Sequence, residues 1–263
     1  VSDLFGGRLR NELSVYANIN RATSNRQPEG FAANARAAAD DGFAAIKAAP
    51  FDGFPALTRP EAEVAAATEL GISCVAAMRE SVGPEVAIKI DAHSNFDVAL
   101  SIEVARRLEP YQLSWYEEPI PPQRVEETTR IREAVEQRMA GGEFLFGVEG
   151  FAPLCQQHAV DVIMPDVKHC GGLAEARQIA TIANLHGVAV SPHNPSGPVS
   201  TAASVQLCAA MSNFDILEFQ WGEVPWRGDL LSPPERFDNG TIQVSNEPGY
   251  GVSLNESVAR EHA

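Results

Sequence analysis

Acidic and histidine side chains recur along this sequence at a nearly constant spacing. Neighbouring members of the series are 23 to 27 residues apart, and the series is Asp91, Glu117, Glu143, Asp166, His193 and Glu218. If the first three lie together, their like charges repel one another, and a bound cation would relieve the repulsion. Mg²⁺, and next Mn²⁺, suits such oxygen ligands, because no cysteine or second histidine lies at the spacing of a zinc site. Capping of the following helix is the alternative for two or three of the six positions.

A histidine lies close to the first of these carboxylates. His93 follows Asp91 by two residues in the segment KIDAHSN. Side chains two apart on one strand project to the same face, so a metal ion and an imidazole would share one wall. His93 could be a metal ligand, an acid or base, or a hydrogen-bonded residue at the strand end, and titration near neutral pH favours catalytic use. Glu117 and Glu118 in WYEEP would point to opposite faces, so only one of them can face the interior.

Asp166 and His193 indicate a general base. Asp166 closes the segment VIMPD, and His193 closes VAVSPH in the next repeat. Adjacent parallel strands lie about 4.8 Å apart, which would bring the two side chains within hydrogen-bonding distance. A carboxylate that accepts a hydrogen bond from one imidazole nitrogen fixes the tautomer and raises the basicity of the other nitrogen. The alternative is a structural ion pair.

The elements that must position these residues form a βα repeat. Short apolar stretches alternate with longer helical patterns. Strands are predicted at 15–20, 42–48, 86–91, 113–117, 138–143, 160–164, 188–191 and 216–219, and helices at 60–70, 98–108, 126–135, 173–185 and 201–211. Pro60 suits the first helical position. Eight such units favour a closed parallel barrel over a long doubly wound sheet, because a barrel gathers the carboxyl ends of all its strands at one mouth.

Composition narrows the class of protein and its partners. The chain has 263 residues, of which 44% are hydrophobic and 21% charged, which is typical of a globular protein. The net charge of −15 would repel a polyphosphate, so nucleic acid is not an expected partner. Since neither an apolar run of about 18 residues nor a signal-peptide core occurs, no membrane is expected and a soluble, cytoplasmic protein is predicted. The four cysteines are expected to be reduced and buried.

Six motifs together resemble the barrel domain of the enolase superfamily. They are KIDAH, WYEEP, GGE, PDVKHCGG, SPHNPSGP and ILEFQW, and the resemblance is to the mandelate racemase branch, nearest to the galactonate dehydratase type. The resemblance covers nearly the whole chain and implies an α/β fold, a modified TIM barrel with (β/α)7β order. It implies that Asp91, Glu117 and Glu143 ligate Mg²⁺. It also implies that Asp166 and His193 form the base dyad.

The resemblance implies roles for the remaining site residues as well. Glu218 matches a carboxyl that, when protonated, donates a hydrogen bond to the substrate carboxylate, and His93 matches a general acid for a departing hydroxyl. Mandelate racemase has Lys-x-Lys on the second strand, whereas here IKAAP supplies Lys47 and then Ala49. A racemase needs groups on both faces of the α-carbon, whereas β-elimination needs a base and an acid, which His193 and His93 can supply. Lys47 is predicted to bind the substrate carboxylate, with a buried structural ion pair as the alternative.

The resulting prediction is a Mg²⁺-dependent hydro-lyase. It would remove the proton α to the carboxylate of a sugar acid, an aldonate or aldarate, and eliminate the β-hydroxyl to give a 2-keto-3-deoxy acid. One alternative is a racemase, epimerase or lactone cycloisomerase that acts through the same ene-diolate. An alternative of another class is a catalytically silent sugar-acid-binding subunit. The expected partner is a small-molecule carboxylate, and the resemblance implies a homo-oligomer.

The resemblance also predicts how the chain is divided. Residues 1–222 are expected to form the barrel, and residues 223–263 a return segment that packs on the family's N-terminal α+β capping domain. The given sequence begins about where that domain should hand over to the barrel, so the capping domain is expected to be missing from it. An isolated barrel would have an open, wet mouth and poor activity.

Overall fold

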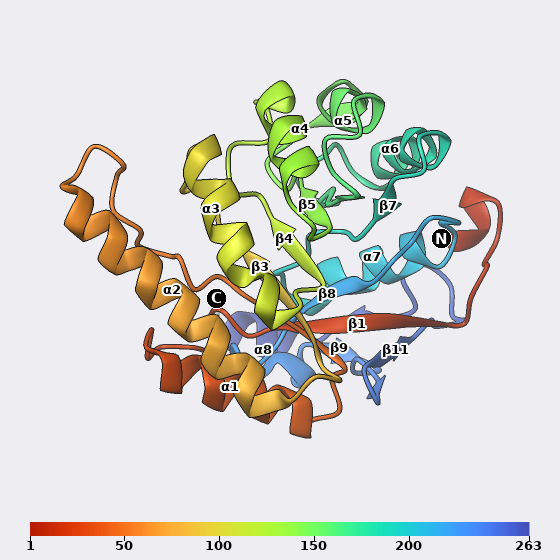
Figure 1. Cartoon of the computed structure of the whole chain (residues 1–263). Coiled ribbons are helices and arrows are strands. Elements are labelled where there is room, and N and C mark those ends of the chain that lie inside the picture. The colour runs from red at the N-terminus through yellow and green to blue at the C-terminus, as the bar shows by residue number, and fades with distance from the viewer. Residues whose placement is uncertain (263) are drawn as a thin grey trace.

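The computed structural model describes residues 1–262, and these form a closed barrel of eight parallel strands (Figure 1). The strands are β1 (Glu12–Asn18), β2 (Ala45–Ala48), β3 (Ala87–Asp91), β4 (Trp115–Glu117), β5 (Met139–Gly141), β6 (Val162–Ile163), β7 (Ala189–Val190) and β8 (Leu217–Gln220). Consecutive strands pair in parallel from β1 to β7, and β8 pairs with β1. A bridge between Val190 and Phe214 closes the ring. The predicted barrel and its eight strands are confirmed.

A helix follows each strand from β1 to β7 and covers the outside of the barrel (Figure 1). The helices are α1 (Pro28–Asp40), α2 (Glu61–Val82), α3 (Val98–Leu108), α4 (Val125–Ala134), α5 (Gly147–Gln156), α6 (Leu173–Leu185) and α7 (Pro198–Cys208). This order is (β/α)7β, as predicted. The five predicted helices are present, and α1 and α5 are additional to them. The additional helix α1 is rich in alanine, and α5 has Pro153 inside it.

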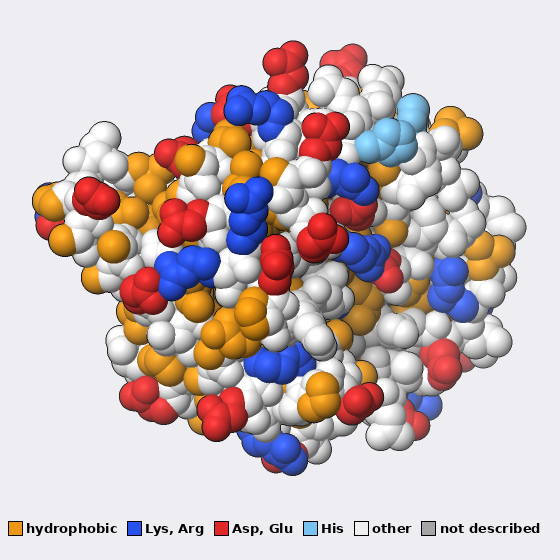
Figure 2. Space-filling view, in the orientation of Figure 1, with side chains coloured by type: hydrophobic (Ala, Val, Ile, Leu, Met, Phe, Trp, Pro, Cys, Tyr) orange, Lys and Arg blue, Asp and Glu red, His pale blue; other side chains and the backbone are white. Residues whose placement is uncertain are grey.

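The helix α2 differs most from its prediction. The expected helix ends at Leu70, but α2 continues to Val82. The added turns supply most of the buried face of α2, including Cys74 and Met78. The first turns project from the barrel at the left of Figures 1 and 2. Pro60 is the N-cap residue, one position outside the helix that it was expected to begin.

Aromatic side chains fill the interior of the barrel below the mouth. Tyr16 on β1 and Trp115 on β4 are fully buried, and their rings meet edge to face with centroids 5.4 Å apart. Lys89 on β3 lies in the same layer, with its Nζ 4.2 Å from the centre of the Trp115 ring. This layer makes the barrel a packed core, and the carboxylates gather at the carboxyl ends of the strands.

The register of the strands brings the predicted site residues to one rim. Asp91 ends β3 and is the register partner of Glu117, which ends β4. Glu218 lies two residues before the end of β8, and Lys47 Nζ on β2 lies 2.7 Å from Glu117 and 3.0 Å from Glu218. Strands β3, β4 and β8 therefore bring carboxylates together at one mouth, as the spacing in the sequence predicts.

The segment after β8 runs back along the barrel. It holds η3 (Arg227–Asp229), β9 (Leu231–Ser232), β10 (Phe237–Asp238), β11 (Thr241–Gln243), β12 (Ser253–Leu254) and α8 (Glu256–Glu261); short turns of 3-10 helix also occur as η1 (Ser2–Phe5) and η2 (Glu109–Tyr111). β11 pairs antiparallel with the first residues of β1. A division of the chain at residue 222, and packing of this segment on a capping domain, stay predictions.

Two further expectations concern the whole chain. The four cysteines are all buried and free, as expected. Within residues 1–262, each helix is too short or too polar to span a lipid bilayer.

Candidate active site

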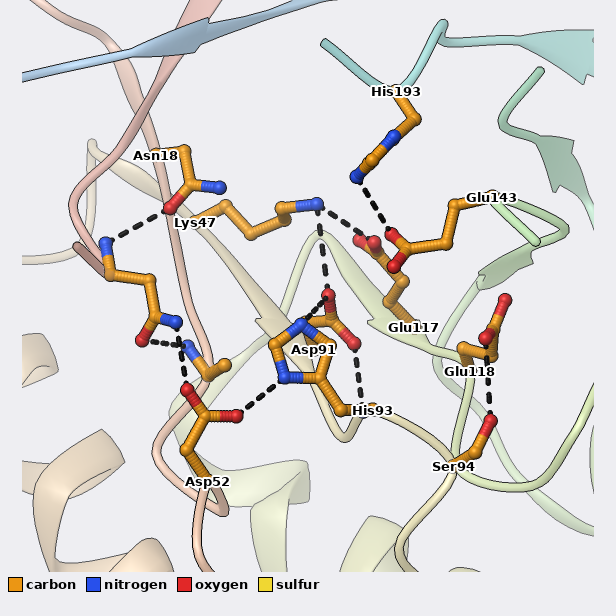
Figure 3. Close-up of polar contacts among 12 residues, drawn as sticks. Asn18, Lys47, Asp52, Asp91, His93, Ser94, Glu117, Glu118, Glu143 and His193 are labelled. Atoms are coloured by element: carbon orange, nitrogen blue, oxygen red, sulfur yellow. Dashed lines mark hydrogen bonds and ion pairs between the residues drawn. The ribbon is translucent and has the colours of Figure 1, made fainter. Parts of the chain in front are cut away.

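Two buried carboxylates and a histidine face a common space at the mouth of the barrel. Asp91 is the last residue of β3, and Glu143 lies two residues beyond the end of β5. One ligand atom from each of Asp91, Glu143 and His93 lies within 4.8 Å of the other two. Figure 3 shows these side chains, together with Glu117, around one space. Two of the three predicted metal ligands thus form one group with His93.

The third predicted ligand, Glu117, is bound by two donors. Lys47 Nζ donates to one carboxylate oxygen of Glu117 at 2.7 Å, and Trp115 Nε1 donates to the other at 2.8 Å. Lys47 Nζ also lies 3.8 Å from a carboxylate oxygen of Asp91. The structure therefore holds Glu117 beside the other carboxylates through a shared lysine.

Burial and mutual repulsion control the charges of the three carboxylates. Burial raises the pKa of Glu117 and of Glu143, and the charge of Asp91 raises both further. Burial would also raise the pKa of Asp91, but the hydrogen bond with His93 and the charge of Lys47 outweigh it and lower the pKa to about 2. Burial and the charge of Asp91 thus disfavour the charged forms of Glu117 and Glu143, and a bound cation would favour those forms.

One oxygen of this cluster lacks a hydrogen-bond donor. Oε2 of Glu143 is buried and makes no hydrogen bond, although His193 Nε2 lies 3.2 Å away in an unsuitable orientation. An unsatisfied buried carboxylate oxygen is costly, and a divalent cation would satisfy it. Carboxylate oxygens with one imidazole nearby suit a divalent metal. The chain therefore has side chains able to hold such an ion.

Lys47 on β2 lies inside the carboxylate cluster. Its Nζ is 2.7 Å from Glu117 and 3.0 Å from Glu218, and the side chain is buried. Burial would lower the pKa of Lys47, but the charges of Glu117 and Glu218 outweigh it and raise the pKa well above its usual value. These contacts match the ion pair considered as the structural alternative. A contact with the substrate carboxylate stays a prediction.

Asp166 and His193 are hydrogen-bonded, as predicted. Nδ1 of His193 lies 2.9 Å from Oδ2 of Asp166, and the backbone N–H of Lys168 donates to Oδ1 of Asp166 at 2.7 Å. Burial would lower the pKa of His193, but the hydrogen bond with Asp166 outweighs it, and the net shift is upward. Since Asp166 accepts at Nδ1, the nitrogen left for chemistry is Nε2, which faces Glu143.

Glu218 on β8 accepts two hydrogen bonds and forms one ion pair. Asn18 Nδ2 and the backbone N–H of Asn194 each donate to it at 2.7 Å, and Lys47 Nζ lies 3.0 Å away. Burial would raise the pKa of Glu218, but the charges of Lys47 and His193 and these hydrogen bonds lower it. In this arrangement Glu218 is a carboxylate. Donation to a substrate would require it to gain a proton.

His93 is held between two aspartates. Its Nδ1 lies 2.5 Å from Oδ1 of Asp52, and its Nε2 lies 3.0 Å from Oδ2 of Asp91. Burial would lower the pKa of His93, but the hydrogen bonds with Asp52 and Asp91 outweigh it and raise the pKa to about 11. His93 is therefore charged at neutral pH in this arrangement and has a proton to give.

Glu117 and Glu118 diverge, as the strand geometry predicts. Glu118 has a φ of 40°, and its carboxylate accepts from the backbone N–H of Gly142 at 2.9 Å and from Ser94 Oγ at 3.3 Å. Burial raises the pKa of Glu118 to about 8, and the charge of Glu143 adds to the shift. Only Glu117 extends toward Lys47.

Sequence reasoning missed four residues that contact the site. Asn18 and Asn194 bind Glu218, Asp52 binds His93, and Trp115 binds Glu117. A signal for Trp115 was present in the sequence: it lies two residues before Glu117 in WYEEP, and side chains two apart on one strand project to the same face. Asp52 belongs to the loop after β2 and carried no such signal.

The fold and this mouth define a class: a (β/α)7β barrel with buried carboxylates and two histidines at the carboxyl ends of its strands. Residues 30–258 match the protein-family model described as "Enolase C-terminal domain-like". The chain belongs to this family, and the resemblance noted in the sequence is confirmed.

Curated relatives cover nearly all of this chain. A D-gluconate dehydratase of Thermoproteus tenax is 34% identical over 262 residues, which are 99% of this chain and 51% of that protein. A D-galactarolactone cycloisomerase of Agrobacterium fabrum is 30% identical over 276 residues, covering 99% of this chain and 68% of that protein. The chain thus spans about half the length of the first relative and about two thirds of the second.

Solved structures agree with the family. A mandelate racemase/muconate lactonizing enzyme-like protein from Rubrobacter xylanophilus is 36% identical, with a TM-score of 0.89 over 99% of this chain and 70% of the other. A member of the enolase superfamily from Salmonella Typhimurium is 26% identical, with a TM-score of 0.88 over 99% of this chain and 70% of the other.

Proposed function

We propose that this chain is the barrel of a Mg²⁺-dependent sugar-acid dehydratase. The substrate would be an aldonate or aldarate, and the product a 2-keto-3-deoxy acid. One observation carries the proposal: Nε2 of His193 faces Glu143, and Nε2 of His93 faces Asp91, so a base and an acid flank one carboxylate cluster (Figure 3). The family and the dehydratase relative of Thermoproteus tenax support it.

The chemical problem is the weak acidity of a C–H bond beside a carboxylate. Removing the α-proton places a second negative charge on a group that is already charged. Mg²⁺ held by Asp91, Glu117 and Glu143 would supply the positive charge that stabilises this ene-diolate. The orphaned oxygen of Glu143 and the raised pKa values of Glu117 and Glu143 favour such an ion in that place.

The protein's own side chains then move the protons. His193 takes the α-proton at Nε2, while Asp166 keeps the imidazole in the required tautomer through Nδ1. His93 gives a proton to the departing β-hydroxyl. A positioned acid or base of this kind is worth about 10²–10⁴-fold in rate.

Two groups are proposed to bind the substrate carboxylate. Lys47 would attract its negative charge from the floor of the mouth. Glu218 would donate a hydrogen bond to it after gaining a proton, because a second carboxylate close by disfavours the charged form of Glu218.

Dehydration is preferred to racemisation because of the chain after β2. A second-strand base would occupy position 49, and Ala49 there is buried and has no proton acceptor on its side chain. The alternative is an isomerase that uses the same ene-diolate, and the 30% identity to a D-galactarolactone cycloisomerase favours it over other rivals.

The test is a substrate screen with the full-length protein encoded by the gene. The protein is incubated in D₂O with Mg²⁺ and a panel of aldonates and aldarates, and products are followed by NMR. Formation of a 2-keto-3-deoxy acid is expected. Deuterium at the α-carbon without loss of water would instead indicate a racemase or epimerase, and ring opening or closure without loss of water a cycloisomerase. A ligand-induced thermal shift without any turnover would indicate a silent binding subunit.

A further inference from the structure

Asp52 is paired with His93 although it lies outside the series of strand-end residues. It follows β2 by four residues, in the loop that leads to α2. Its Oδ1 lies 2.5 Å from Nδ1 of His93. An ionised carboxylate can only accept a hydrogen bond, so Nδ1 of His93 is the donor and carries a proton. The contact fixes which nitrogen of His93 faces the mouth.

Asp52 is itself held in place by the neighbouring loop, which joins β1 to α1. Asn20 Nδ2 donates to Oδ2 of Asp52 at 2.8 Å, and Arg26 Nη2 lies 3.2 Å from the same oxygen. Arg26 also donates to the carbonyl of Ala49 and to the side chain of Asn20. Oδ2 is therefore occupied, and Oδ1 is left for the imidazole, so the carboxylate has one orientation.

The backbone around His93 also directs its ring to Asp52. His93 and Ser94 have φ values of 46° and 57°, in the left-handed region that such residues seldom adopt. Oδ1 of Asp91 accepts from the backbone N–H of His93 at 2.9 Å. Asn95 Nδ2 donates to the carbonyl of Phe51 at 3.2 Å, which joins the two loops beside the Asp52 contact. The turn is fixed from both sides.

The same arrangement occurs at the proposed base. There Asp166 accepts at Nδ1 of His193 and leaves Nε2 facing a carboxylate of the cluster. At His93, Asp52 accepts at Nδ1 and Nε2 faces Asp91. Carboxylates that bind the second nitrogen of a histidine orient the ring and fix its tautomer. The mouth thus has two aspartate–histidine pairs, one on each side of the carboxylates.

We propose that Asp52 is a positioning residue that aims Nε2 of His93 at the departing hydroxyl. This inference rests on the proposed dehydration. In that step His193 takes the α-proton, the C–H electron pair forms the C=C bond, and the C–O bond breaks with its electrons on oxygen. The oxygen takes the Nε2 proton of His93 and leaves as water. The enol then ketonises by losing its hydroxyl proton and gaining one at the β-carbon.

The experiment separates proton removal from loss of the hydroxyl. Asp52→Asn and Asp52→Ala are compared with the wild-type full-length protein and with Asp40→Asn, a control at an exposed i,i+4 ion pair. Dehydration and α-proton exchange are measured in D₂O with Mg²⁺ on an acid sugar that the wild type turns over. Both Asp52 variants should lower kcat for dehydration about 10- to 100-fold, with KM within about threefold. Exchange should stay within about threefold, so the ratio of exchange to elimination rises, and the control should match the wild type.

A second substrate excludes a merely structural role. In the 3-deoxy-3-fluoro analogue, fluoride leaves with less need of a proton, so both Asp52 variants should release fluoride at close to the wild-type rate. The inference is overturned if dehydration is unchanged in both variants, or if exchange, dehydration and fluoride release all fall together. If the wild type dehydrates no acid sugar, the proposed function fails and this inference fails with it. If the wild type dehydrates and the variants do so equally well, only the inference fails.

Discussion

The two sides of the mouth use one kind of pair in two different environments. On the β6–β7 side, the Asp166 side chain is 0% exposed and that of His193 is 13% exposed. On the β2–β3 side, the side chains of Asp52 and His93 are 33% and 36% exposed. Each aspartate also has a cation 3.2 Å away. Lys168 lies beside Asp166, and Arg26 lies beside Asp52.

The difference lies in exposure to water, because all four side chains come from residues that lie two to four positions beyond the ends of their strands. Charges in a buried pair interact strongly, while water screens an exposed pair. A base that must act on a weakly acidic C–H bond gains most from the first environment. An acid that releases water into the mouth can work in the second.

Removal of the metal should abolish both proton removal at the β6–β7 side and loss of the hydroxyl at the β2–β3 side. Dialysis against EDTA should stop α-proton exchange and dehydration, and Mg²⁺ should restore both. The pKa values of Glu117 and Glu143 are raised, so protons compete with the ion, and the apparent Mg²⁺ affinity should fall as the pH falls. Saturating Mg²⁺, at about 100 times its Kd, should stabilise the fold by about 2.7 kcal/mol in thermal unfolding. Full activity in EDTA, with no bound metal by elemental analysis, would contradict the metal assignment.

Substitution on the β6–β7 side should have the next largest effect. His193→Asn removes the proposed base, so exchange and dehydration should fall together by about 10³–10⁴-fold, at the upper end of general-base effects. Exchange is followed by NMR in D₂O and dehydration by the keto product. A matched substitution, His186→Asn, changes a histidine at the C-cap of α6, on the outside of the barrel, and should leave both rates near the wild-type values. Retained exchange in His193→Asn would assign the base to another group.

Substitution on the β2–β3 side should separate the two rates. His93→Asn should lower dehydration about 10²-fold and leave exchange within about threefold, because only loss of the hydroxyl needs the acid. If exchange falls as much as dehydration, His93 acts as a metal ligand or a structural residue, and the two sides no longer differ in role.

Most of the residues that the sequence predicted recur once per βα unit. Asp91 and Glu117 end their strands and Glu218 lies within β8, so the barrel repeat itself sets their spacing and places them at one mouth. The series also predicts which strands are neighbours, because consecutive βα units are adjacent in a parallel barrel. Fold class and most of the candidate site could be predicted for this reason.

Loop residues could not be predicted in this way. Asp52 reaches His93 only because the loops after β2 and β3 fold toward each other, and no spacing in the sequence encodes that approach. The hydrogen-bond partners of Glu117, Lys47 and Trp115, could not be predicted either. They depend on which donors the folded chain brings close to the carboxylate.

The smallest expected effect concerns the cation beside the buried pair. Lys168 Nζ lies 3.2 Å from Oδ2 of Asp166, but the lysine side chain is 41% exposed, so water screens its charge. Ion pairs of this kind are worth about 0–1 kcal/mol, which is at most about a fivefold change in rate or equilibrium. Lys168→Met should therefore change dehydration by less than about fivefold.

Arg26 is the corresponding cation beside Asp52. It also binds the carbonyls of Asn20 and Ala49, so Arg26→Met should lower the dehydration rate more than Lys168→Met does. The expected result is a drop in dehydration with exchange preserved, measured beside the lysine variant. An equal, small effect of the two substitutions would mean that the loops hold Asp52 without the arginine. The β2–β3 pair would then be as independent of its cation as the β6–β7 pair.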